Sequence, residues 1–528
     1  MTFLPIVDRE LRVAARRKGT YRMRSWTALV AILVTFAFLI AAAIEGPGTQ
    51  TGPILLILLS VYTASLCLLV SLFLTSDCIS EEKRDGTLGL LFLTDLYGYD
   101  VVLGKFIARS LNAFYGLLAL LPVMAISLLF GGLTGAEFWR VALALINALF
   151  VSLVVGTFIS SFTRDARASL TGSMLLLATM FGGLPALEWL VDHFKLGSFW
   201  SSLFGISPSF PFYYAYESNY VGNSDQYWQP LTVSNLLAWG MLAFSSWIVG
   251  RTWQYKTILT RAPTGWAKFL RPGGLSPRRP LLGNDPIVWL IGDEPAVRRL
   301  AWCIVIGWSV LVTITALVNE QLTAYTYQGA KICAILLKIL IASQACRFFA
   351  DARRNGLLEI ILCTPLRNQE ILRGHWLALQ RVFLWPVVVF TLSNLLPMTL
   401  GLYRGFGGSG FSAEFASGIG VVGWAGLALY FVADIYAICW FGTWLSLASK
   451  KPDRAALWTV LFVIMIPSVF CFMDIIADLF FILWAVIKLH QDFRVLLGQQ
   501  YQPVRASSWL PIKPPVIART SNTASSSV

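Results

Sequence analysis

Two ionisable residues, Lys338 and Asp434, interrupt long apolar segments of the sequence. A charge inside a membrane is costly, so such residues usually pair with one another or line a path for an ion or a substrate. Lys338 and Asp434 could form a mutual ion pair, or they could belong to such a path. Lys331 lies nearer the end of its segment, where a long side chain can reach the interface. The sequence leaves both interpretations of Lys338 and Asp434 open.

Sequence motifs for enzymatic chemistry are missing. The nearest candidate for the phosphate-binding motif G-x-x-x-x-G-K-[S/T] runs from Gly98 to Lys105, but its spacing is wrong and Phe106 replaces the hydroxyl residue. No G-x-S-x-G or H-E-x-x-H motif occurs, there is no C-x-x-C pair, and the three histidines lie far apart. We therefore expect no catalytic residue, no metal and no cofactor in this chain.

A charged stretch followed by a glycine occurs twice, 270 positions apart. Residues 81–96 align with residues 351–366 without a gap, and each stretch is expected to form a helical hairpin that leads into an apolar segment. The identical pairs are Arg84/Arg354, Gly86/Gly356, Leu88/Leu358, Thr94/Thr364, Leu96/Leu366 and Gly104/Gly374, while Lys83/Arg353 and Asp100/Glu370 keep their charge. If the glycines adopt backbone angles closed to other residues, they set the direction of the helix that follows.

Long apolar helices must position these residues. Of the 528 residues, 56% are hydrophobic and 13% charged, and the mean hydropathy is +0.67, which excludes a soluble or disordered protein. Crossing a bilayer takes about 20 apolar residues. Twelve such segments can be delimited: Trp26–Ile44, Pro53–Thr75, Asn112–Leu133, Glu137–Phe162, Ala168–Val191, Ser234–Gly250, Leu300–Val318, Thr326–Phe348, Val382–Tyr403, Ala416–Ala448, Ala455–Cys471 and Ile475–Leu489.

The basic residues predict the orientation of these segments. The net charge is +13, and if the N-terminus is cytoplasmic, only Lys195 and Arg404 of the 41 Lys and Arg residues fall in outer loops. This distribution is typical of the positive-inside rule, so the charge indicates topology and contact with membrane lipid rather than a nucleic-acid partner. We expect both termini to be cytoplasmic.

The predicted fold is all-α, a polytopic membrane protein of about 12 transmembrane helices in two parallel six-helix repeats. Residues 1–250 would form the first half, 251–299 a basic cytoplasmic linker with an interfacial helix, 300–490 the second half, and 491–528 a disordered cytoplasmic tail. Six is an even number, so both copies keep one orientation and would be related by an axis along the membrane normal. The outer loop His193–Val233 is rich in aromatic residues and would form an interfacial belt or a cap over one side.

The repeated stretch resembles the cytoplasmic loop after the second span in permease subunits of the ABC type-2 transporter family, which carries an E-E-x-x-x-G-T-x-x-x-L-x-x-x-P-L-like run. The residues that follow this pattern are Glu81, Glu82, Gly86, Thr87 and Leu96 in the first half, and Gly356, Pro365 and Leu366 in the second. The first half departs from it with Asp95 in place of the proline. The second half has Asp351 and Ala352 in place of the Glu pair, and Leu357 in place of the threonine.

The resemblance implies an exporter permease in the cell membrane. Its loops would couple to separate ATP-binding cassette subunits, in two copies, which would hold ATP and Mg²⁺. Arg84 and Arg354 would position the hairpins or contact an acidic surface of these partners.

Two other classes compete with this prediction. One is an ion-coupled secondary transporter that uses Lys338 and Asp434. The other is a membrane enzyme that modifies lipids or glycans, which would need a catalytic residue near Asp192, His193 or Glu217. The repeated hairpin favours the permease, because neither rival requires it.

Overall fold

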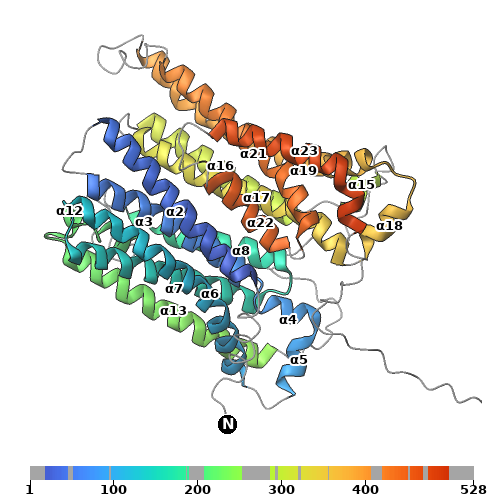
Figure 1. Ribbon diagram of the computed structural model, residues 1–528, viewed down its shortest axis with the longest axis horizontal. Coiled ribbons are helices and arrows are strands. Elements are labelled where there is room, and N and C mark those ends of the chain that lie inside the picture. Colours follow the sequence, from blue (N-terminus) through green and yellow to red (C-terminus); the bar gives the residue numbers. More distant parts are fainter. Residues whose placement is uncertain are drawn as a thin grey trace, which may run out of the picture.

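The computed structural model describes residues 18–45, 51–93, 97–185, 187–188, 207–252, 286–291, 295–318, 323–354, 356–405, 419–449, 452–465, 467 and 474–498. Helices make up nearly all of this part of the chain, and it contains no strand (Figure 1). The fold class predicted from hydropathy, an all-α polytopic membrane protein, is confirmed. Seven helices in the described residues are long and apolar enough to cross a membrane.

The first half, residues 18–252, contains six long helical segments and several short ones. The long segments are α2 (Lys18–Glu45), α3 (Thr51–Thr75), α6 (Gly98–Ala125), α7 (Gly135–Phe162), α8 (Ala166–Ala178), which continues as the π-helix η2 (Thr179–Gly183), and α13 (Ser224–Thr252). The short helices are α4 (Ser80–Asp85), α5 (Thr87–Phe92), η1 (Ile126–Phe130), α11 (Phe210–Tyr213) and α12 (Glu217–Tyr220).

The second half, residues 286–498, also contains six long helical segments. The long segments are α16 (Pro295–Val318), α17 (Thr323–Arg354), α19 (Asn368–Gly405), α21 (Ile419–Ala448), α22 (Pro452–Val460), which continues as the π-helix η4 (Leu461–Met465), and α23 (Asp474–Gly498). The short helices are α15 (Pro286–Ile291) and α18 (Leu357–Cys363). In both halves a π-helical turn therefore occurs in the fifth long segment.

Several helices begin earlier than the apolar segments indicate, among them α2 at Lys18, α13 at Ser224 and the third helix of each half. The third apolar segments start at residues 112 and 382, whereas α6 begins at Gly98 and α19 at Asn368. In α6 and α19, the carboxylate of an acidic residue in the first turn, Asp100 or Glu370, accepts a hydrogen bond from the backbone N–H of the residue just before the helix. This contact stabilises a polar first turn, so each helix starts before its apolar segment does. At the other end of the chain, α23 extends to Gly498, beyond the boundary expected at residue 490.

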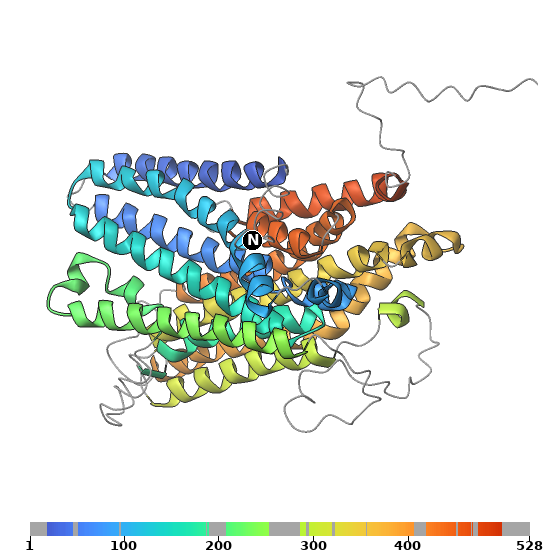
Figure 2. The ribbon, with the colours of Figure 1, turned by 90° about the horizontal axis from the view of Figure 1, so that it is seen from below.

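The two halves lie side by side, and the helices of each are packed in the same way (Figures 1 and 2). The six long helices of each half are counted here in their order along the chain. In both halves the second helix packs on the fourth, the fourth on the sixth, and the first on the third. The fifth helix packs on the second and the fourth in both, and the third on the second, the fourth and the sixth. The halves meet where α3 contacts α22, where α8 contacts α16, and where the ring of Trp26 lies 6.0 Å from that of Phe462.

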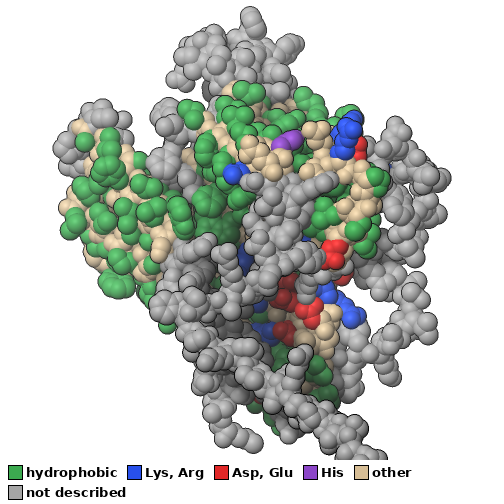
Figure 3. Space-filling model, turned by 45° about the vertical axis from the view of Figure 1, so that its right-hand side comes forward, with side chains coloured by type: hydrophobic (Ala, Val, Ile, Leu, Met, Phe, Trp, Pro, Cys, Tyr) green, Lys and Arg blue, Asp and Glu red, His purple; other side chains and the backbone are tan. Residues whose placement is uncertain are grey.

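One end of the bundle carries α4, α5 and α18, and we call it the hairpin end. Figure 3 shows Lys, Arg, Asp and Glu side chains gathered at this end, beside a flank covered with hydrophobic side chains. Along the flanks, large apolar residues such as Phe36, Trp139 and Trp385 are more than 60% exposed. Exposed apolar flanks between polar ends are what a bilayer requires of the helices that cross it.

At the opposite end, the aromatic loop of the first half is held by Arg140 of α7. Its guanidinium forms an ion pair with Glu217 of α12, donates to the carbonyl of Ala215 at 3.1 Å, and lies 4.0 Å from the ring centre of Tyr220. The hydroxyl of Tyr216 lies 2.7 Å from that of Ser60, and burial raises the pKa of Tyr216 to about 12. This part of the loop packs as a cap on the first half; the segment 193–206 lies outside the described residues.

Candidate functional site

The repeated stretches form hairpins whose turns have the same backbone conformation. Gly86 connects α4 to α5 with φ 74° and ψ 2°, and Gly356 connects α17 to α18 with φ 70° and ψ 1°. These angles lie in the left-handed region, which an L-residue with a side chain rarely adopts. A Cβ atom at either glycine would meet nothing within 4 Å, so the backbone angle, not space, requires glycine here.

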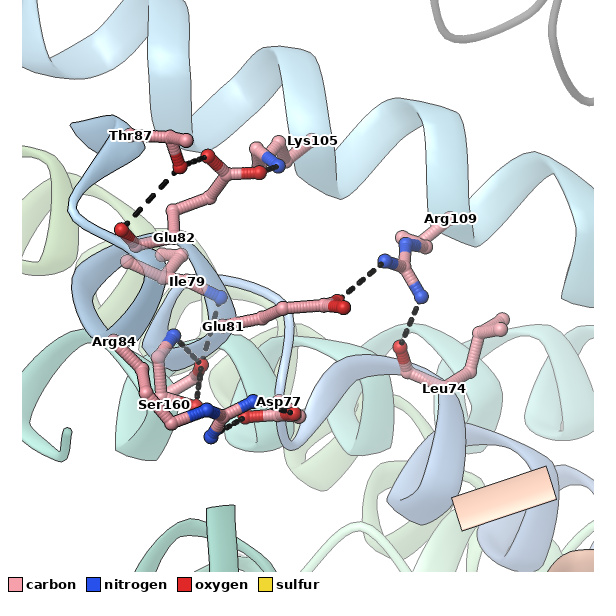
Figure 4. A network of polar contacts seen from close by, with 11 residues as sticks. Leu74, Asp77, Ile79, Glu81, Glu82, Arg84, Thr87, Lys105, Arg109 and Ser160 are labelled. Carbon is pink, nitrogen blue, oxygen red and sulfur yellow. Dashed lines mark hydrogen bonds and ion pairs between the residues drawn. The ribbon is translucent and has the colours of Figure 1, made fainter. Parts of the chain in front are cut away.

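In the first half, the acidic pair binds to α6 (Figure 4). Glu82 forms an ion pair with Lys105 at 2.5 Å and also accepts a hydrogen bond from the hydroxyl of Thr87. Glu81 lies 3.7 Å from Arg109, which stands one helical turn after Lys105. The two carboxylates therefore attach α4 and the start of α5 to the helix that follows them.

A second group of contacts fixes the turn before α4 (Figure 4). Arg84 forms an ion pair with Asp77 at 3.1 Å, across a turn of its own segment. The hydroxyl oxygen of Ser160 in α7 accepts hydrogen bonds from the backbone N–H groups of Ile79 at 2.8 Å and Ser80 at 2.9 Å. Arg84 thus contacts an acidic group of its own chain, in the turn that precedes the hairpin.

The second hairpin is held differently. Ala352 is buried at the position equivalent to Glu82, and His375 replaces Lys105. The His375 ring is 3% exposed and lies against Phe348, at 5.5 Å and 20°, and Phe349, at 5.0 Å and 65°. Aromatic and apolar packing takes the place of the ion pair between Glu82 and Lys105 at this hairpin.

The basic pair Lys83/Arg353 makes the same kind of contact in both halves, a contact that was not predicted from the sequence. Lys83 donates to the carbonyl of Ser161, at the end of α7. Arg353 donates to the carbonyls of Leu447 and, at 3.3 Å, Ser449, at the end of α21. A cation at the C-terminus of a helix satisfies carbonyls that have no partner within the helix.

The acidic pair Asp100/Glu370 also has one role. A carboxylate oxygen of Asp100 accepts from the N–H of Tyr97 at 3.1 Å, and one of Glu370 accepts from the N–H of Arg367 at 3.0 Å. Both residues stand three positions after the N-cap, where this contact stabilises a helix start. The signal that could have revealed both charged pairs is charge kept at a constant offset of 270 positions in sequence.

Each short helix buries one face and exposes the other. Leu88 and Leu358 are each 4% exposed, whereas Leu90 is 64% and Ile360 66% exposed. These four residues are two pairs in the 270-position alignment. The helices α5 and α18 therefore present an apolar side chain to the surroundings at the same place.

Not every predicted residue can be placed. Leu96 and the side chain of Arg354 lie outside the described residues, although Arg354 is the last residue of α17. Pro365 and Leu366 follow α18, and Pro365 is exposed. Thr87, Glu81, Glu82 and Arg84 take part in the contacts of the first hairpin.

Residues 47–251 match the family described as ABC-2 family transporter proteins. This part of the chain belongs to the ABC-2 transporter family. No curated protein matches it. The matched range contains the whole first hairpin and its contacts with α6 and α7, so those contacts belong to the ABC-2 domain. The second hairpin lies beyond this range.

The structure also brings Lys338 and Asp434 together inside the second half of the chain. The ammonium group contacts a carboxylate oxygen of Asp434, and the two side chains are 6% and 0% exposed. When Arg167 is aligned with Arg454, the residue of the first half that corresponds to Asp434 is the neutral Asn147 of α7, whose side chain hydrogen-bonds to Ser234 and Asn235 of α13.

Proposed function

We propose that this chain is the membrane permease of an ABC-2 exporter and that it combines two permease units in one polypeptide. The observation that carries the proposal is the pair of matched hairpins: Gly86 and Gly356 adopt the same left-handed conformation at equivalent positions. The equal packing of the helices in both halves supports a duplicated unit.

We propose that the exposed faces of α5 and α18 are the attachment sites of two ATP-binding cassette subunits. Leu90 and Ile360 would each enter an apolar pocket of one subunit. Burying a leucine or isoleucine side chain contributes about 1.5–3 kcal/mol. ATP and Mg²⁺ would be held by the partners, and both termini and the hairpin end would face the cytoplasm of the cell.

The contacts around the first hairpin offer a mechanical link from such a partner to the membrane helices. Glu82 connects α4 to α6 through its ion pair with Lys105, and Lys83 connects α4 to the end of α7 through a hydrogen bond. Movement of an attached subunit would therefore shift the third and fourth helices together. In the second half, Arg353 supplies the link to the fourth helix, α21.

The experiment is native mass spectrometry of the tagged chain purified from its own cells in mild detergent. We expect one copy of the chain with two ATP-binding subunits. Leu90→Asp or Ile360→Asp should each leave one subunit bound, and the double variant none. Val221→Asp is the matched control, because Val221 is 70% exposed but lies at the end of the first half opposite α5.

Three results would overturn the proposal. A complex with two copies of this chain for each pair of ATP-binding subunits would show that one chain does not form the complete permease. Loss of subunits in Val221→Asp, or full retention in the double variant, would show that α5 and α18 are not the attachment sites.

A further inference from the structure

The second half contains a cavity of about 50 Å³ that is lined by residues of α15, α16, α17 and α19. This volume holds roughly four water molecules, which is close to the size of a phosphate group. Three polar side chains line it, those of Gln344, Arg347 and His375, and among the described residues of the wall none is acidic. The rest of the wall is apolar and consists of Ile291, Val297, Phe348, Ala378, Leu379, Val382 and Phe383.

The cavity lies where the apolar parts of the helices give way to the polar hairpin end. The apolar segments delimited from the sequence end at Phe348 in α17 and begin at Val382 in α19, and the cavity wall includes both boundaries. Just beyond the wall, Leu384 and Trp385 of α19 are 50% and 65% exposed and belong to the apolar flank. A bilayer places its polar headgroups at this kind of boundary, between hydrocarbon and water.

His375 brings unused hydrogen-bonding capacity to the cavity. Both nitrogens of its ring are buried, and neither makes a hydrogen bond of good geometry to the described part of the chain. The backbone of Ala345 approaches the ring, but it can engage only one of the two nitrogens. Because a buried polar group without a partner is costly, the other nitrogen favours a ligand in the cavity.

Arg347 brings further donors to the same wall. It is 4% exposed and also interacts with another group of the chain. A guanidinium has five N–H donors in a fixed fork, so one such contact does not exhaust it, and the fork matches the oxygens of a phosphate. Gln344 stands one turn before Arg347 on the same face of α17 and adds an amide.

In the first half, the chain itself supplies the acceptor at the equivalent place. Glu82 forms an ion pair with Lys105, and the residues that correspond to these two are Ala352 and His375. The second half therefore keeps a potential donor in His375, but Ala352 cannot supply the acceptor that Glu82 provides. A ligand with acceptor oxygens would take the place of that carboxylate.

We propose that this cavity binds the phosphate group of a membrane phospholipid, with His375 and Arg347 as hydrogen-bond donors and with the acyl chains along the exposed apolar side of α19. A free phosphate ion gains nothing from a largely apolar wall, whereas a lipid buries its glycerol and chain carbons against it. Pockets with basic residues between membrane helices are suited to lipid headgroups. The bound lipid joins α17 to α19 beside the second hairpin, as Glu82 and Lys105 join α4 to α6 beside the first.

Native mass spectrometry tests the site on the full chain, stripped of lipid in mild detergent and titrated with dioleoylphosphatidylglycerol. We expect His375→Phe to weaken the tightest binding event about tenfold or more, because it removes a hydrogen bond to a charged group. His375→Gln keeps an N–H donor and should retain most of the affinity. His490→Phe is the matched control, since His490 lies in α23 outside the cavity wall, and it should bind lipid as the wild type does.

The same assay distinguishes the possible sources of the phosphate. Dioleoylglycerol has the same chains without a phosphate and should not occupy the site, and inorganic phosphate at millimolar concentration should not displace the phospholipid. Occupation by dioleoylglycerol or displacement by inorganic phosphate would overturn the proposal. Unchanged affinity in His375→Phe, or an equal loss in His375→Phe and His375→Gln, would show that the ring does not donate to the lipid and would overturn it as well.

Photolabelling of the wild-type chain gives a second test that does not depend on the folding of a variant. A phosphatidylglycerol with a diazirine next to its glycerol should label Leu379, Val382 or Phe383. Labelling that leaves residues 375–385 unmarked would contradict the site. No ATP-binding subunit takes part in either experiment, so the outcome is independent of the function proposed above.

Discussion

At the scale of single residues, the hairpins depend on two glycines, although no neighbouring atom would clash with a side chain at either position. Gly86 and Gly356 have open space around the position of a Cβ atom, yet both have a positive φ. The requirement is therefore a property of the backbone alone. Any residue with a side chain must either adopt the strained angle or redirect the short helix that follows.

The first prediction concerns these glycines. Gly86→Val and Gly356→Val should each lower the free energy of unfolding by about 1–2 kcal/mol, because a side chain at positive φ meets the backbone. Gly89→Ala in α5 is the control, since that glycine also has open space but no positive φ, and it should be neutral or stabilising. Denaturant titration in detergent measures the differences. Equal stability of Gly86→Val and Gly89→Ala would show that the angle is not needed.

The second prediction concerns Arg84. Its partner Asp77 is close, and the two side chains are 32% and 15% exposed, so the pair is worth at most about 1 kcal/mol. Arg84→Glu should place like charges together and lower the stimulation of ATP hydrolysis by the assembled transporter. Exchanging the charges in Arg84→Glu with Asp77→Arg should restore most of it. If the exchange restores nothing, Arg84 acts on an acidic surface of the partner.

The equivalent arginine should respond differently. The position that corresponds to Asp77 is Arg347, so Arg354 cannot use the same ion pair. Arg354→Glu should change the stimulation of ATP hydrolysis to a different degree than Arg84→Glu. Equal effects of the two variants would indicate a role that does not depend on Asp77.

At the scale of elements, the two hairpins have the same shape but different supports. The first is held by ion pairs with α6, the second by the stacking of His375 and by buried apolar residues. What they share is a cation at the end of the fourth helix and an acid at the start of the third. These shared contacts fix the three helices that meet at each hairpin.

The third prediction follows from the cations. Lys83→Met and Arg353→Met should each destabilise the chain by about 1.5–3 kcal/mol, the contribution of hydrogen bonds from charged groups. Amide exchange should increase at the last turn of α7 in the first variant and of α21 in the second. Lys83→Arg keeps the charge and should behave as the wild type. Unchanged exchange at the end of α7 in Lys83→Met would remove the role assigned to Lys83.

At the scale of the whole molecule, the chain places two similarly packed halves side by side, with both hairpins at one end. The second helix of the first half, α3, packs on the fifth helix of the second half, α22. The fifth helix of the first half, α8, packs on the first helix of the second half, α16. Because each half has an even number of long helices, the same end of both halves must face the same side of the membrane.

The fourth prediction tests that orientation. Cys363 in α18 is an exposed native cysteine at the hairpin end, and Ser224 begins α13 at the opposite end of the bundle. In a chain whose other cysteines are replaced, an impermeant thiol reagent should label Ser224→Cys in intact cells and Cys363 only in inverted vesicles. Labelling of Cys363 in intact cells would reverse the proposed topology.

The sequence by itself determined the elements and the duplicated hairpin. Hydropathy over about 20 residues is a local property, so it located the twelve long segments, and only their ends moved where a polar turn extended a helix. The constant offset between residues 81–96 and 351–366 located both glycines, because a turn conformation is encoded within a few residues. Such signals do not depend on how the helices are rotated against one another.

The tertiary structure decided which side chains meet. Glu81 and Glu82 are predicted coupling residues, and the basic residues that their carboxylates bind, Arg109 and Lys105, are set by the rotation of α6 about its axis. Lys338 and Asp434 could be suspected from their apolar surroundings, whereas Asp478 joined them only because α23 packs on α21. Pairings between distant helices depend on helix rotation and register, which the spacing of residues along one helix does not specify.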